Sequence, residues 1–117
     1  MSLESQLFTV LQAVCPRTYP DFAPTTTVRP YVTYQQIGGE AVNFMDRLVP
    51  NKRNARMQIN VWADTRASAT TTIQAIEDAI RMSTVFQGEA ESAPMTSFDA
   101  DFPVYSAAQD FLIWADR

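Results

Sequence analysis

The sequence contains no histidine, and this absence restricts the chemistry that the chain can carry. Activated serine and cysteine nucleophiles usually pass their proton to a histidine, so Ser-His-Asp and Cys-His arrangements are excluded. Most zinc geometries need several Cys or His ligands, and the only cysteine is Cys15. The glycine-rich dinucleotide fingerprint and the phosphate-binding P-loop are both missing. We therefore predict a protein that is not an enzyme and that uses no cofactor and no metal.

Asp99 and Asp101 are the carboxylates whose spacing comes nearest to a site. In a strand, residues two apart lie on one face, where two carboxylates can hold a divalent cation together with water. A metal-dependent enzyme built on this pair is one hypothesis. We favour a solvated acidic surface or turn, because such pairs arise by chance in an acidic segment. Cys15 has Arg17 nearby but no base, so we interpret it as a small apolar residue at a helix end.

Four basic side chains cluster within ten residues of a chain whose net charge is −4 and whose pI is about 4.6. They are Arg47, Lys52, Arg53 and Arg56. We expect them in or beside a polar loop over residues 38–55, which begins with Gly38 and Gly39. Three interpretations stay open: a solvated mobile loop, pairing with an acidic region of an adjacent copy, or the lining of a channel through which DNA passes. The acidic pI argues against a dedicated nucleic-acid binder.

The charge is distributed unevenly along the chain. Residues 89–117 carry six acidic side chains and one basic side chain, Arg117. Part of this segment is a candidate acidic counter-surface for the basic cluster, formed by Glu89, Glu91, Asp99 and Asp101. A molecule with two such poles can pack head to tail around a ring. The alternative is an acidic surface that only faces solvent.

The helices that position these residues follow from the periodicity of the apolar side chains. A 3.6-residue period predicts a first helix over residues 3–14, with Ser2 as its N-cap. A second helix is predicted to begin at Asp64 or Thr65 and to end near Ser83. Its apolar stripe consists of Ala69, Ile73, Ile76 and Ile80.

Alternating apolar and polar side chains predict strands. The predicted segments are residues 18–19, 31–37, 54–63, 85–87 and 109–115, with part of 95–105 also extended. Trp62 falls on the polar face of its strand, where a large aromatic is either covered by a loop or part of a subunit interface. The last strand is apolar on both faces, so we expect it at the centre of the sheet or covered on both sides.

The composition, with 117 residues, 46% of them hydrophobic and 19% charged, is that of one globular domain, which we assign to residues 1–117. A lone cysteine is typical of a reducing compartment. The sequence opens with no signal-peptide pattern, and no apolar run approaches the ~20 residues that span a bilayer. We expect no contact with a membrane.

With these elements in place, the chain resembles the small tail-completion proteins of tailed bacteriophages and prophages, a family long catalogued as a domain of unknown function. The resemblance rests on Pro30-Tyr-Val-Thr-Tyr-Gln, a polar loop, Arg56-Met-Gln-Ile-Asn-Val-Trp-Ala and the helix that follows. The N-terminal helix and Phe111-Leu-Ile-Trp extend it over nearly the whole chain. The chain is also similar, more distantly, to the tail-terminator proteins of long-tailed phages.

The resemblance implies an α+β fold, an antiparallel β-sheet with two α-helices packed mainly on one face. It also implies a non-catalytic structural protein that forms a homo-oligomeric ring, a hexamer, at the head-proximal end of the tail. Such a ring stops growth of the tail tube and joins the tail to the head. The implied partners are further copies, the tail tube protein and the head-tail connector protein, with DNA only in passage through the channel. The implied location is the virion tail or head-tail junction, and the bacterial host cytoplasm before assembly.

The residues leave a second class of function open. It is a small soluble bacterial α+β module that binds a ligand or a protein between sheet and helices, without catalytic activity. A stable monomer whose melting temperature rises with ligand favours that module. A closed ring favours the structural protein, whose candidate interface or channel lining consists of Arg47, Lys52, Arg53, Arg56 and Trp62.

Overall fold

The computed structural model describes residues 2–24, 27–45 and 48–117. Its first element is helix α1 (Leu3–Val14), and the N-cap prediction is confirmed because the Ser2 side chain accepts the backbone N–H of Ser5 at 3.1 Å. An N-cap bond of this kind satisfies one of the backbone donors that a helix start leaves unpaired. The buried side chains of α1 are Leu3, Leu7 and Leu11. One apolar stripe of this helix therefore faces the core, as its 3.6-residue period predicts.

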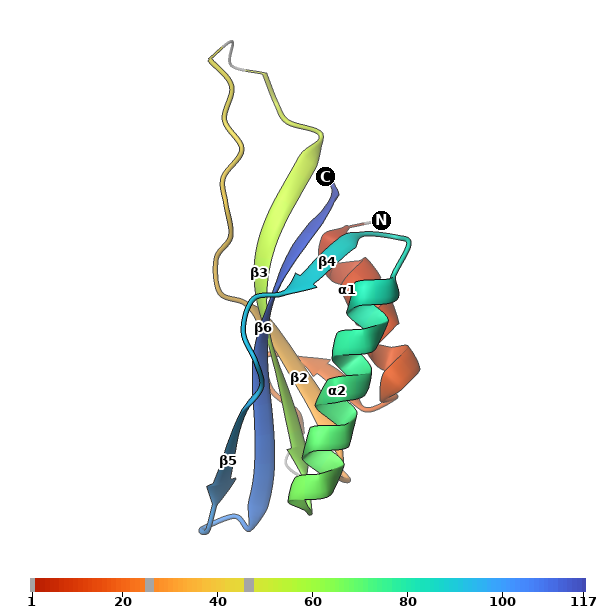
Figure 1. Cartoon of the computed structure of the whole chain (residues 1–117), viewed down its shortest axis with the longest axis vertical. Helices are drawn as coiled ribbons and strands as arrows, with labels where there is room; N and C mark the ends of the chain where they lie inside the picture. Colours follow the sequence, from red (N-terminus) through yellow and green to blue (C-terminus); the bar gives the residue numbers. More distant parts are fainter. Residues whose placement is uncertain (1, 25–26, 46–47) are drawn as a thin grey trace.

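The remaining elements are helix α2 and a six-stranded open sheet in the described residues (Figure 1). The strands are β1 (Thr18–Pro20), β2 (Tyr31–Gln36), β3 (Lys52–Ala63), β4 (Gln87–Ala90), β5 (Met95–Asp99) and β6 (Val104–Asp116). Their order across the sheet is β1-β2-β3-β6-β4, and β5 also pairs with β6. The α+β class is therefore confirmed.

The sheet is mixed, which corrects the expectation of a purely antiparallel one. Strand β1 runs parallel to β2, with Thr18 opposite Val32, whereas every other pair is antiparallel. The reason is that the chain returns past β1 before β2 begins. A parallel pair needs such a return crossover, because a tight hairpin joins only antiparallel strands.

Strands β3 and β6 form the centre of the sheet and pair along their length, from Lys52 opposite Asp116 to Ala63 opposite Tyr105. The core-facing side chains of β3 alternate as predicted, with Met57, Ile59 and Val61 buried. The central position of the last strand is confirmed, since β3 lies on one side of β6 and β4 and β5 lie on the other.

Helix α2 (Arg66–Met82) begins at Thr65, whose side chain accepts the backbone N–H of Ser68, and ends at Ser83. Its buried side chains are those of the predicted stripe, Ala69, Ile73, Ile76 and Ile80. Both helices cover the same face of the sheet, so the placement of two helices on one face is also confirmed (Figure 1). The main hydrophobic core lies between the helices and that face.

Several predicted strand boundaries differ from the structure, among them the start of the last strand, which is Val104 rather than Gln109 because β5 pairs with it there. Strand pairing also explains two further differences. The loop predicted over residues 38–55 ends earlier, because β3 already begins at Lys52 and pairs there with the end of β6. The short strand predicted at 85–87 instead begins at Gln87, opposite Trp114, and extends to Ala90. In both places the partner strand β6 sets the boundary, and local sequence carries little information about it.

The molecule is elongated, with extents of 53 × 25 × 23 Å. The connection between β2 and β3 reaches one end of the long axis, and the turn between β5 and β6 lies at the other (Figure 1). No helix in the described parts of the chain is long and apolar enough to cross a membrane.

Candidate interaction surfaces

The helix-free face of the sheet carries polar side chains that bond to one another. Gln35 Nε2 on β2 donates to Gln58 Oε1 on β3 at 3.1 Å. The hydroxyls of Ser97 and Ser106 form a similar cross-strand bond between β5 and β6. Cross-strand pairs of this kind stabilise a sheet whose outer face is wet. These polar groups therefore find their partners within the sheet.

Trp62, predicted as a loop-covered or interface residue, is half-buried against its neighbours on this face. Its ring stacks on Tyr31, with centroids 6.3 Å apart and planes inclined by 25°. Its indole Nε1–H donates to Thr33 Oγ1 at 3.1 Å. The indole thus satisfies its donor within the chain, and a role for Trp62 in a subunit interface stays a prediction.

Arg56 and Glu91 form an ion pair that joins the predicted basic cluster to the predicted acidic counter-surface inside one chain. Arg56 lies on β3, and Glu91 follows β4, where its backbone N–H donates to Asp110 O at 2.9 Å. The hydrogen bond and the charge of Glu91 raise the pKa of the Arg56 guanidinium. The positive charge of Arg56 is therefore compensated locally on the helix-free face.

The other described members of the basic cluster point to opposite faces of β3, although both lie where that strand begins. Lys52 pairs with Asp116 across β3 and β6, and this hydrogen bond lowers the pKa of the Asp116 carboxyl. Arg53 follows Lys52 on the strand and so points to the opposite face, where its Nη2 donates to Gln36 Oε1 at 3.1 Å. Arg47, the remaining member of the predicted basic cluster, lies outside the described residues.

An open cleft of about 510 Å³ lies where β3 begins and β6 ends. Its charged lining consists of Lys52, Arg53, Arg117 and Glu40. Gly39 brings the chain close to β3 at this place, because a Cβ there would lie 2.6 Å from Asn54 O. The Glu40 N–H then donates to Asn54 Oδ1 at 2.7 Å. The cleft is thus a moderately basic end of the molecule.

The acidic residues lie on and next to β4 and β5, the strands that pair with β6 on the side away from β3. Glu89 is exposed on β4, and Asp99 ends β5. The backbone N–H of Asp101 donates to Asp99 Oδ1 at 3.0 Å, so the two carboxylates belong to one turn rather than to one strand face. Within the described residues, no group of three or more His, Cys, Asp or Glu side chains is placed to hold a metal ion.

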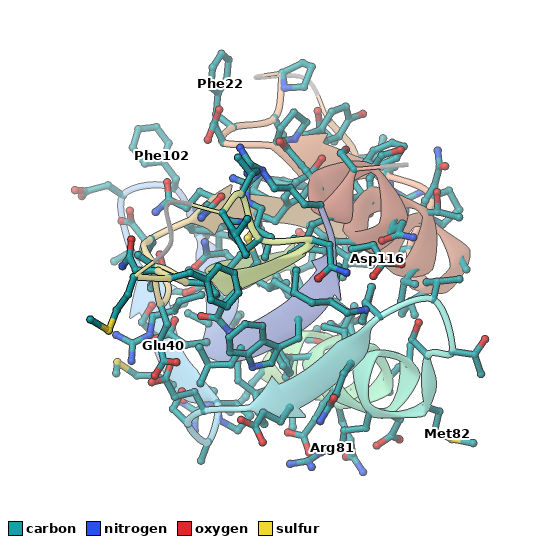
Figure 2. All side chains as sticks on the ribbon, turned by 90° about the horizontal axis from the view of Figure 1, so that it is seen from above. Phe22, Glu40, Arg81, Met82, Phe102 and Asp116 are labelled. Carbon is teal, nitrogen blue, oxygen red and sulfur yellow. The ribbon has the colours of Figure 1, made fainter. Side chains whose placement is uncertain are left out.

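Exposed apolar side chains are the feature that the sequence analysis missed. One group lies between β2 and β3, where Phe44 is 50% and Met45 is 102% exposed. A second lies along β5 and its turn, where Met95 is 75% and Phe102 is 70% exposed. Figure 2 shows Phe102 projecting away from the body of the protein. Phe44 and Phe102 lie in segments predicted as a loop or as only partly extended, and a large aromatic in such a segment is the signal that could have identified them.

The fold defines a small α+β protein whose surface features are strand edges, charged ends and exposed apolar side chains. The chain belongs to the family described as tail completion protein gp17, which it matches over residues 4–114. Among curated proteins, no match to the chain was found. Family membership confirms the resemblance seen in the sequence and gives the chain a structural role in the tail of a bacteriophage.

Family membership also indicates where the protein is located and which kinds of protein it contacts. Its location is the tail of the virion, and its partners are other components of the phage tail or head. The role of the family is structural, which points to a protein that is not an enzyme.

Proposed function

We propose that copies of this chain form a closed ring, a hexamer, at the head-proximal end of the tail. The ring ends growth of the tail tube and joins the tail to the head. It contacts the tail tube protein on one side and the head-tail connector protein on the other. The chain is made in the bacterial host cytoplasm, from a phage or prophage genome, and assembles there. Membership in the tail completion family is the observation that carries this proposal.

The positions of the exposed apolar side chains support a ring in which neighbouring copies contact each other through the ends of the molecule and the edges of the sheet. Exposed apolar side chains occur at both ends of the long axis, near Phe44 and near Phe102. Contiguous exposed apolar surface on a soluble protein is typical of an interaction site. The helix-free face instead combines paired polar side chains with the stacked rings of Tyr31 and Trp62.

The charge on that face suits a channel through which DNA only passes. The guanidinium of Arg56 is compensated by Glu91, and Asp110 lies nearby on β6. A surface that binds DNA tightly presents uncompensated basic side chains to the phosphates. A nearly neutral or acidic lining holds phosphates weakly, so DNA can move along it.

Electron microscopy of particles made by a phage whose copy of this gene is deleted tests the proposal. We expect tails of uncontrolled length and filled heads without tails, with both defects repaired by the wild-type gene. Tails of normal length that stay unattached would restrict the role to head joining. Infectious particles of normal appearance would overturn the proposal.

A further inference from the structure

Residues 40–45, called the arm here, form an extended part of the connection between β2 and β3 (Figure 1). Between residues 41 and 45, no main-chain hydrogen bond to another described residue is present. Apolar side chains are frequent, since Ala41, Val42, Phe44 and Met45 surround one asparagine. The backbone N–H and C=O groups of this segment are therefore available to pair with a strand of another copy.

Strand β5 is an open edge of the sheet. It pairs with β6 alone among the described strands, and all five of its residues are exposed. No lysine or proline lies within Met95–Asp99, although such residues commonly protect edge strands. The turn after β5 is fixed in place, because Arg29 Nη1 donates to Pro103 O at 2.7 Å and to Asp64 Oδ1 at 3.1 Å. The edge is therefore preformed and ready to accept a further strand.

The arm and this edge cannot meet within one molecule. They lie at opposite ends of a body 53 Å long, and both are on the same side of it (Figure 1). A contact between them must therefore join two copies. We propose that the arm of one copy adds as an extra strand to β5 of the next copy, an inference that rests on the proposed self-assembly.

The chemistry of the two segments is complementary. In an added strand, Val42 and Phe44 would lie on one face and Met45 on the other. Met95 and Phe98 lie on opposite faces of β5, so each face of the new pair brings exposed apolar side chains together and removes them from water. The cleft at the base of the arm carries Arg53 and Arg117 beside the arm's own Glu40, whereas Asp99 and Asp101 lie at the end of β5. Unlike charges at the two ends orient neighbouring copies head to tail.

The contact is heterologous, because the donating and accepting segments are different. Such a contact leaves a free arm and a free edge on every incomplete assembly. It ends only when the last copy meets the first, which gives a closed ring. Main-chain bonds in strand addition give affinity, while alternate side chains set the register and the partner.

Paired cysteines test this contact in purified tails and in the isolated protein. The tested chain carries Asn43→Cys in the arm and Thr96→Cys in β5, with Cys15→Ser to remove the native thiol. Oxidation should link successive copies into a ladder that ends at the copy number of the ring. A control chain carries Gln74→Cys, on the exposed face of α2, in place of Thr96→Cys. It should form no regular ladder, because Gln74→Cys has no partner cysteine at the proposed contact.

Solution mass and microscopy separate this inference from the proposed function. Closed rings without a ladder would overturn strand addition and leave the ring standing. A ladder without a defined end would support strand addition and overturn the closed ring. A ladder of equal yield from the Gln74→Cys control would show non-specific linking and would also overturn the inference. If neither rings nor a ladder formed in tails, both proposals would fail.

Discussion

The side-chain amide of Gln109, buried in the middle of β6, donates to Glu77 Oε1 on α2 at 2.6 Å. The same Nε2 donates to Ser92 O at 2.8 Å. One amide thus ties the helix and the segment between β4 and β5 to the central strand. Glu77 also accepts from Arg81, one turn further along α2, at 3.1 Å. The carboxylate therefore receives donors from the sheet and from its own helix.

The first prediction concerns acid stability. The hydrogen bond from Gln109 is the main cause that holds the pKa of Glu77 below its ordinary value of 4.5. Because this pKa is lower in the folded chain, the ionised Glu77 stabilises the fold above about pH 4.5, and this contribution is lost as pH falls through the lowered pKa. Glu77→Gln should therefore reduce the free energy of unfolding at pH 7 by about 1 kcal/mol and flatten its fall below pH 5.

Urea denaturation at pH 7 and at about pH 3.5 measures this effect. Gln109→Leu removes the principal donor and should also flatten the pH dependence. Parallel pH profiles for the wild type and both variants would show that the bond contributes nothing to acid stability.

The second prediction compares two adjacent glycines with positive φ. Gly38 has a φ of +132° and open space where a Cβ would lie, whereas a Cβ on Gly39, at φ +142°, would lie 2.6 Å from Asn54 O. Gly38→Ala should cost about 1–3 kcal/mol through backbone strain alone. Gly39→Ala should cost more, because the chain must also move away from β3. Thermal unfolding of the two variants tests this, and equal losses would contradict it.

The third prediction concerns the core between α2 and the sheet. Ile76 is completely buried on the inner face of α2. Ile76→Ala should lower the free energy of unfolding by about 2–5 kcal/mol, because it removes apolar contacts and leaves a cavity. Gln74→Ala, at an exposed position of the same helix, should change it by no more than about 0.5 kcal/mol. Denaturant titration of both variants measures the difference.

The fourth prediction tests the ion pair between Arg56 and Glu91. Arg56→Glu places like charges together and should lower the melting temperature, more strongly at low salt than at high salt. Adding Glu91→Arg to that variant reverses the pair and should restore most of the loss. If the double variant were less stable than Arg56→Glu, the two side chains would not interact as the structure shows.

The fifth prediction separates assembly from folding. Phe44 is half-exposed in the arm, so Phe44→Ser should change the free energy of unfolding by no more than about 0.5 kcal/mol. The same change should lower the fraction of chain that enters assembled tails, because the arm loses its apolar contact. Met82→Ser, at an exposed apolar position of α2, is the matched control and should assemble normally. Quantitative immunoblots of purified tails compare the two.

Both helices and the alternating faces of β3 follow from the sequence alone. Leu3, Leu7 and Leu11 recur at helical spacing, and Met57, Ile59 and Val61 recur at strand spacing. Such periods are local, since each follows from the geometry of one element packed against one core. The polar segment around Gly38 and Gly39 was also visible as a break between strands.

The tertiary structure decided which charged and polar groups meet. Arg56 pairs with Glu91 over a separation of 35 residues, and Gln109 meets Glu77 over a separation of 32. Pairing with β6 also extends β3 back to Lys52 and sets the start of β4. These contacts depend on strand order and register, which arise when distant segments share one sheet. Apolar and polar periods along the chain fix which face of each element is buried, but they do not fix the neighbour across it.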